Sequence, residues 1–255
     1  MARAELELPD LTRGLKLPEG MELAGDEVVI PQGNLNRMVP VHYKNRFYLL
    51  RLPMTAEEVR PTHEVIATEY EALGFTGLGG GYGFRTLTEQ VEFVQKCQAL
   101  GLGVGGLERW DGLTIARYQP GMRLSHYNRM AEADVGVTLR FLDTVVSAHQ
   151  QGVVLGDRWT PNALVTPIGD IVHIDFDIAL SGPVAREFEL SQAIFYGSQS
   201  TNLVVAKAVA LWWQAMSGFG KYDGDVVEYF LKNHQTYNES HPDMANPYPM
   251  IIEGD

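Results

Sequence analysis

Near the middle of the chain, residues 153–180 read VVLGDRWTPNALVTPIGDIVHIDFDIAL. Two short runs of β-forming residues in this segment flank Thr-Pro-Ile-Gly-Asp at 166–170, a composition typical of a turn. A hairpin at this point brings Asn162 and Asp175 side by side, although thirteen residues separate them. Asp157 lies five residues before Asn162, on the loop that enters the first strand. The segment therefore predicts three oxygen-bearing side chains at one end of a hairpin.

These three side chains have the chemistry that phosphoryl transfer needs. A carboxylate beside an amide oxygen suits Mg²⁺, which prefers hard oxygen ligands and leaves positions for water and phosphate oxygens. A second carboxylate close by can accept a proton from an attacking hydroxyl, and the rest of the catalysis is orientation and charge neutralisation. We therefore interpret Asp157 as the candidate base, and Asn162 and Asp175 as candidate metal ligands.

The composition of the 255-residue chain is ordinary for a soluble globular enzyme, with 45% hydrophobic and 20% charged residues. Lys and Arg number 20 against 32 Asp and Glu, which gives a net charge of −12. This balance argues against a nucleic-acid partner, because binding phosphates requires a basic face. It mildly favours a cationic small ligand, although acidity also serves solubility alone.

Targeting and redox signals point to a reducing compartment. Cys97 is the single cysteine, so a disulfide framework is excluded. Residues 1–14 are charged from the third position and have no apolar core, unlike a signal peptide. The apolar run at 203–213 is interrupted by Lys207 and is too short for a bilayer. We expect a cytoplasmic protein with no membrane span.

The first part of the chain has the pattern of a β-meander followed by helices. Strands are expected at 28–30, 38–43 and 47–52, with turns at Gly33-Asn34 and Lys44-Asn45. A helix is expected over 56–73, and Pro61 predicts a break or a new start inside it. Residues 74–83 hold six glycines but follow a helix and lack a Lys-Ser/Thr ending, so we interpret them as a mobile connector and not as a phosphate-binding loop.

The remainder of the chain alternates briefly and then becomes helical. A helix is expected over 88–100 with Thr88 as its N-cap, followed by a strand pair around Asp111-Gly112. Further helices are expected at 134–149, 188–196, 202–216 and 225–233. Structure rich in β therefore comes first, and α-rich structure follows.

The central segment resembles the catalytic and metal-binding loops of the protein-kinase superfamily, closest to the aminoglycoside phosphotransferase/choline kinase branch. That branch carries H-G-D-x-x-x-x-N followed by I-D-[FW], and here the matching runs are LGDRWTPN at 155–162 and HIDFD at 173–177. Other runs similar to this branch are GNLNRMVPV at 33–41, FYLLRLP at 47–53, GLTIARYQPG at 112–121, and LSGP at 180–183 with FEL at 188–190.

The resemblance implies an α+β, bilobal protein-kinase-like fold. Its small, β-rich N-lobe would span residues 1–117, and its larger, α-rich C-lobe would span 118–255. The activity implied is ATP- and Mg²⁺-dependent transfer of the γ-phosphate to a hydroxyl of a small molecule. Cationic alcohols, amino sugars and sugars are the expected acceptors, with specificity expected in 122–127 and in the helices after Tyr196.

The resemblance also implies a set of nucleotide-binding residues. Arg51 would reach the α- and β-phosphates, and an acidic helix residue, Glu69 or Glu89, would orient it. The phosphates would be covered by the loop 33–37, with Gly33, Asn34 and Asn36, and the adenine would be held by Arg117, Tyr118 and Gln119.

The chain departs from the branch in the loop 33–37, which is poor in glycine, and at two further positions. Leu155 replaces the usual His before Gly-Asp, and Glu189 stands where the branch carries Asp. Asp177 either touches the metal or ends its loop. Two other functions stay open: a kinase acting on protein or lipid-linked sugar hydroxyls, and a pseudokinase that binds nucleotide or a partner without turnover.

Overall fold

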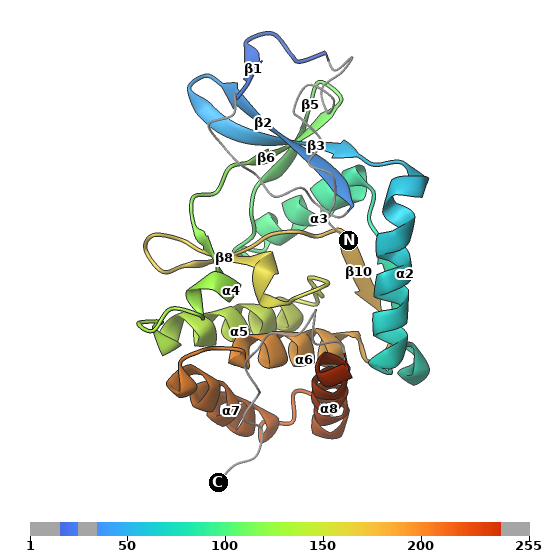
Figure 1. The fold of residues 1–255 in the computed structure, drawn as a ribbon, viewed down its shortest axis with the longest axis vertical. Helices are drawn as coiled ribbons and strands as arrows, with labels where there is room; N and C mark the ends of the chain where they lie inside the picture. The colour runs from blue at the N-terminus through green and yellow to red at the C-terminus, as the bar shows by residue number, and fades with distance from the viewer. Residues whose placement is uncertain (1–15, 25–34, 241–255) are drawn as a thin grey trace.

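The computed structural model describes residues 16–24 and 35–240. The protein is a mixed α/β structure with a five-stranded sheet at one end and a helical part at the other (Figure 1). The strand expected at 28–30 and the turn expected at Gly33-Asn34 lie outside the described residues. Within the described ranges, no helix combines the length and the apolar character that crossing a membrane would require.

The sheet is antiparallel and is built around the predicted meander. Its strand order is β1 (Met21–Leu23), β2 (Asn36–Tyr43), β3 (Arg46–Pro53), β6 (Leu113–Arg117) and β5 (Leu107–Trp110). The turn at Lys44 and Asn45 is confirmed, and both residues have positive φ, the geometry of a tight hairpin turn. The turn at Asp111-Gly112 is confirmed by the same sign of φ. The sheet buries one apolar face, formed by Val39, Val41, Leu50 and Ile115.

The helix after β3 has the expected extent but is more continuous than the sequence suggested. Helix α2 (Ala56–Ala72) begins at the N-cap Thr55, which forms a capping box with Glu58. The break expected at Pro61 is wrong, because α2 continues through that residue. The capping box stabilises the first turn, and the buried Tyr70 anchors the C-terminal end. The helix therefore tolerates the loss of the one backbone hydrogen bond that Pro61 cannot donate.

The glycine-rich segment is a packed connection instead of a mobile one. It holds a short 3-10 helix, η1 (Thr76–Leu78), and a strand, β4 (Gly81–Phe84), which pairs antiparallel with β10 (Ile178–Ser181). A Cβ on Gly80 would lie 2.3 Å from the Phe75 ring, and one on Gly182 would lie 2.3 Å from the Gly79 carbonyl. The glycines are required because backbone and rings approach closely here. Neither β4 nor β10 was predicted.

Helix α3 (Leu87–Ala99) lies beside β5 and begins one residue before the expected start. Its N-cap is Thr86 and not Thr88, and Glu89 completes a capping box. Thr86 is followed by Glu three residues later, the spacing that a capping box requires.

The helical part confirms the expected helices with shifted ends. The four expected helices are α5 (Val135–Gln150), α6 (Ala185–Ser198), α7 (Leu203–Ser217) and α8 (Gly224–Ser240), and a short helix that was not predicted, α4 (Leu124–Tyr127), precedes them. The predicted hairpin is β8 (Ala163–Val165) with β9 (Ile171–His173), joined by β7 (Met122–Arg123) into a small sheet. A short 3-10 helix, η2 (Thr160–Asn162), leads into β8. Helices α5 to α8 and this hairpin share the largest apolar core.

Candidate functional site

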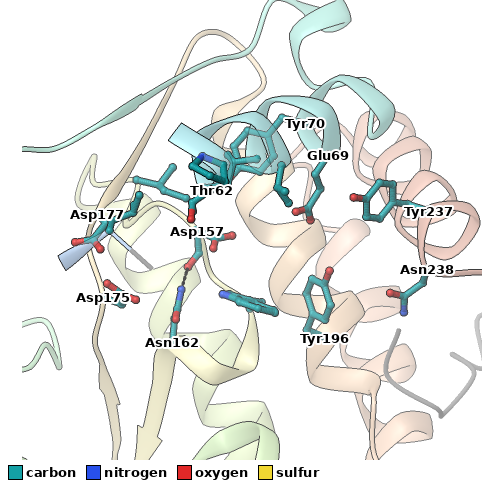
Figure 2. A pocket seen from close by; sticks show the side chains of 16 residues that line it. Thr62, Glu69, Tyr70, Asp157, Asn162, Asp175, Asp177, Tyr196, Tyr237 and Asn238 are labelled. Atoms are coloured by element: carbon teal, nitrogen blue, oxygen red, sulfur yellow. Dashed lines mark hydrogen bonds between the residues drawn. The ribbon is translucent and has the colours of Figure 1, made fainter. Parts of the chain in front are cut away.

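The β8–β9 hairpin gathers the three predicted side chains. Ala163 pairs with His173, and the backbone N–H of Ile174 donates to the carbonyl of Asn162 at 3.0 Å. The Asn162 side-chain amide in turn donates to the backbone carbonyl of Asp157 at 3.0 Å. Figure 2 shows Asp157, Asn162 and Asp175 around one cavity of about 390 Å³. The spatial prediction made from residues 153–180 is confirmed.

Asp157 lies in an environment that favours proton exchange near neutrality. Burial raises the pKa of its carboxyl to about 6, against the opposing effect of the adjacent Arg158. The Gln192 amide donates to one carboxylate oxygen of Asp157 at 2.9 Å, which fixes the side chain in the cavity. A carboxylate of this kind can accept a proton from a hydroxyl above pH 6 and release it again.

The chemistry of the donors at Asn162 and Asp175 fits Mg²⁺. The Asn162 side-chain nitrogen is engaged by Asp157, so its oxygen is the atom left for a cation. The Asp175 side chain is 46% exposed and lines the cavity. No cluster of three His, Cys, Asp or Glu suited to a metal occurs among the described residues. Mg²⁺ does not need one, because it is commonly bound by one or two carboxylates together with phosphates and water.

Arg158 holds the loop that carries Asp175. Its fully buried guanidinium donates to the backbone carbonyls of Asn162, Ile174 and Asp175, and it lies over the Phe176 ring. Asp175 has a φ of 61°, a conformation that non-glycine residues adopt only at some cost. The donors of Arg158 compensate for that cost, so the loop conformation depends on this arginine.

Glu189 braces the loop that carries Asp157. Its carboxylate accepts the backbone N–H of Leu155 at 3.2 Å and of Gly156 at 2.5 Å, and His149 contacts it at 2.6 Å. Leu155 itself is buried beside Phe176. The position where the branch carries His therefore contributes packing here, and Glu189 supplies the polar support of the loop.

Arg51 is paired differently from the expectation. Its guanidinium donates to Asp177 at 2.8 Å and to Asp175 at 3.4 Å. The expected ion pair with Glu69 or Glu89 is not among those of the described residues. Glu89 instead accepts from Thr86 at the start of α3. Two carboxylates of the loop after β9, Asp175 and Asp177, therefore take the place of a helix glutamate at Arg51.

The remaining nucleotide candidates fall into three groups. Gly33 and Asn34 lie outside the described residues. Asn36 donates to Asp177 at 3.1 Å, at the edge of the cavity. Arg117 ends β6, and Tyr118 and Gln119 follow it; the Tyr118 N–H donates to the Phe47 carbonyl at 3.3 Å. These three residues are not among the described residues that line the cavity.

Helix α2 forms a wall of the cavity that the sequence interpretation missed. Thr62, Ile66 and Glu69 line the cavity from this helix. Burial raises the pKa of Glu69 to about 7, with a further contribution from the charge of Asp157. Figure 2 shows Glu69 near Tyr196 and Tyr237 on the side of the cavity away from Asp175. The spacing of three and four residues along 62–69 was the available signal, because it places these side chains on one helix face.

Neither a protein-family model nor a curated protein provides a significant match to this chain. The function of this chain is therefore inferred from the geometry and chemistry of the site itself.

Proposed function

We propose that the protein is a phosphotransferase that moves the γ-phosphate of ATP, with Mg²⁺, to a hydroxyl of a small molecule. The observation that carries this proposal is the meeting of Asp157, Asn162 and Asp175 in one cavity at the end of the β8–β9 hairpin. The proposal includes a kinase-like, two-lobed arrangement with lobes at 1–117 and 118–255. The five-stranded sheet followed by the helical part is compatible with it.

The residues divide the work of the proposed reaction between them. Asn162 and Asp175 would hold Mg²⁺, which would supply charge neutralisation at the phosphates when bound. Asp157 would orient the acceptor hydroxyl and take its proton as the oxygen bonds to the γ-phosphorus and ADP leaves. Arg51 would add positive charge beside the phosphates.

The acceptor would occupy the side of the cavity formed by α2. There Glu69 presents a largely buried carboxylate, and Trp159, Tyr196 and Tyr237 present aromatic rings. A carboxylate flanked by aromatic faces favours a cationic group, because both attract positive charge. Among the acceptors considered, this supports an alcohol or amino sugar that carries an amine over a neutral sugar.

ADP release over a panel of hydroxyl compounds tests the proposed reaction. With Mg²⁺ and ATP, amine-bearing alcohols should stimulate ADP release by the native protein. Asp157→Asn should reduce the stimulated rate by roughly 100-fold or more, the usual contribution of a general base. Asp175→Ala serves as the blank, because it removes a proposed metal ligand.

Equal slow rates for the native protein and Asp157→Asn across the panel would contradict turnover. If Mg²⁺-dependent nucleotide binding persisted in that case, the result would favour the pseudokinase alternative. Stimulation by a protein or a lipid-linked sugar, and by no small molecule, would favour the kinase of larger acceptors.

A further inference from the structure

Residues 174–177, called the metal loop because they carry the proposed Mg²⁺ ligand Asp175, hold two acidic residues with different surroundings. The Asp177 side chain is only 9% exposed, whereas the Asp175 side chain is 46% exposed. One Asp177 oxygen, Oδ1, accepts from Arg51 at 2.8 Å and from Asn36 at 3.1 Å. Both residues line the cavity, but Asp175 is the more open of the two, and Asp177 is occupied by side chains of the sheet. This contrast indicates separate roles for two carboxylates that lie two residues apart.

Arg51 has donors to spare after its contact with Asp177. Its side chain is 11% exposed, and its Nη2 makes the contacts to Asp177 and Asp175. Its Nε is buried and has no hydrogen-bond partner among the described residues. A buried guanidinium N–H without an acceptor is costly. The unused donor indicates an anionic oxygen as a further partner, and phosphate is the group that an arginine fork matches best.

We propose that Asp177 is the positioning residue of Arg51. Asp177 holds one edge of the guanidinium, so that the remaining N–H groups of Arg51 address the phosphates of the nucleotide. Asn36 supports Asp177 from β2, so the arrangement joins two strands of the sheet to the metal loop. This inference rests on the proposed function and assigns to Asp177 the role that a helix glutamate was expected to fill.

The two rival partners for Arg51, Glu89 and Glu69, lie elsewhere in the structure. Glu89 accepts from the Thr86 backbone at 2.7 Å and from its hydroxyl at 2.8 Å, which fixes it in the first turn of α3. Figure 2 shows Glu69 and Asp177 on opposite sides of Asp157. The orientation of Arg51 is therefore coupled to the metal loop and not to the position of a helix.

A double-mutant cycle tests the pair. Binding of ADP labelled with N-methylanthraniloyl is measured with Mg²⁺ and with EDTA for the native protein, Asp177→Asn, Arg51→Met and the double variant. Each single change should weaken nucleotide binding about tenfold, a loss in the range expected when one ion-pair network is broken. Because both changes disrupt the same network, the double variant should bind no more weakly than either single variant. Glu92→Gln, an exposed charge on α3, is the matched control and should bind like the native protein.

Other results would overturn the inference in distinguishable ways. Additive losses would show that Arg51 and Asp177 act independently. If Asp177→Asn weakened nucleotide binding only in the presence of Mg²⁺, and raised the Mg²⁺ concentration required as Asp175→Asn does, Asp177 would be a metal ligand. Weaker nucleotide binding by Glu89→Gln would indicate that Glu89 of α3, and not Asp177, orients Arg51. If the native protein bound no nucleotide, the proposed function itself would fail.

Folding is checked in the same experiment by thermal unfolding of every variant. If Asp177→Asn does not fold, the pair is tested from the other side. Arg51→Lys keeps the charge but loses the fork, and it should bind more tightly than Arg51→Met and more weakly than the native protein. Equal affinity of Arg51→Lys and the native protein would overturn the proposal.

Discussion

At the scale of single residues, the pKa of Asp157 sets the pH dependence of the proposed reaction. The free carboxyl has a pKa near 3.8, and burial raises it to about 6 in the folded protein. A base must be ionised, so kcat/KM should rise as pH increases through about 6 and level off above it. Gln192→Leu removes a hydrogen bond to the ionised form and should move the midpoint upward.

A pH profile of ADP release for the native protein, Gln192→Leu and Glu69→Gln provides the measurement. Glu69 has a pKa raised to about 7 in the same cavity, so its variant separates the two carboxyls. The rise through pH 6 should persist in Glu69→Gln. Its disappearance there would assign the titration to Glu69 instead.

Glu189 offers a second prediction at this scale. The fully buried carboxylate accepts the backbone N–H groups of Leu155 and Gly156, next to Asp157, and contacts His149. Glu189→Gln keeps the shape but replaces one acceptor oxygen with a donor, so at least one buried N–H loses its partner. The expected loss is about 2 kcal/mol of unfolding free energy, measured by urea denaturation. Glu187→Gln, on the same helix outside the loop contact, should change it by less than about 0.5 kcal/mol.

At the scale of elements, two substitutions in the glycine-rich connection (residues 74–83) distinguish a packing role of its glycines from a role in ligand binding. Gly80→Ala places a Cβ 2.3 Å from Phe75, whereas Gly77→Ala meets nothing within 4 Å. Gly80→Ala should cost about 1–3 kcal/mol by overpacking, and Gly77→Ala should be neutral or slightly stabilising. Urea midpoints give the comparison. Weaker nucleotide binding by Gly77→Ala, with unchanged stability, would instead support a phosphate-binding loop.

The glycine-rich connection also shows which parts of the fold could be predicted from the sequence and which could not. Strong periodicity and turn residues predicted α5, the β2–β3 hairpin and the β8–β9 hairpin, because local interactions determine these elements. The pairing of β4 with β10 joins residues almost one hundred positions apart, as in Ile178 with Phe84, and no local pattern specifies it. The partner of Arg51 was missed for the same reason, since Asp177 reaches it only after the loop has folded against the sheet.

At the scale of the whole molecule, an aromatic cluster joins the glycine-rich connection to the helical part. Phe75 stacks on Phe188 of α6 with ring centroids 4.2 Å apart, and Tyr70 of α2 and Phe230 of α8 contact the same ring. The Asn233 side chain donates to the Leu73 carbonyl at 2.8 Å beside them. Helix α2 carries Glu69 into the cavity, so this cluster also fixes the position, relative to Asp157, of the cavity side where the acceptor is proposed to bind.

Phe188→Ala should therefore destabilise the molecule as one unit. Truncating this fully buried ring removes its contacts with four neighbouring rings, those of Tyr70, Phe75, Phe230 and His234, at an expected cost of about 3–5 kcal/mol. Far-UV circular dichroism and tryptophan fluorescence should report the same lowered urea midpoint, because Trp110 lies at the sheet and Trp213 in the helical part. Phe219→Ala, at a 70% exposed ring, is the matched control and should leave the midpoint almost unchanged. Two separated unfolding transitions in Phe188→Ala, with the transition of Trp110 still at the native urea midpoint, would show that the sheet is stable without this cluster.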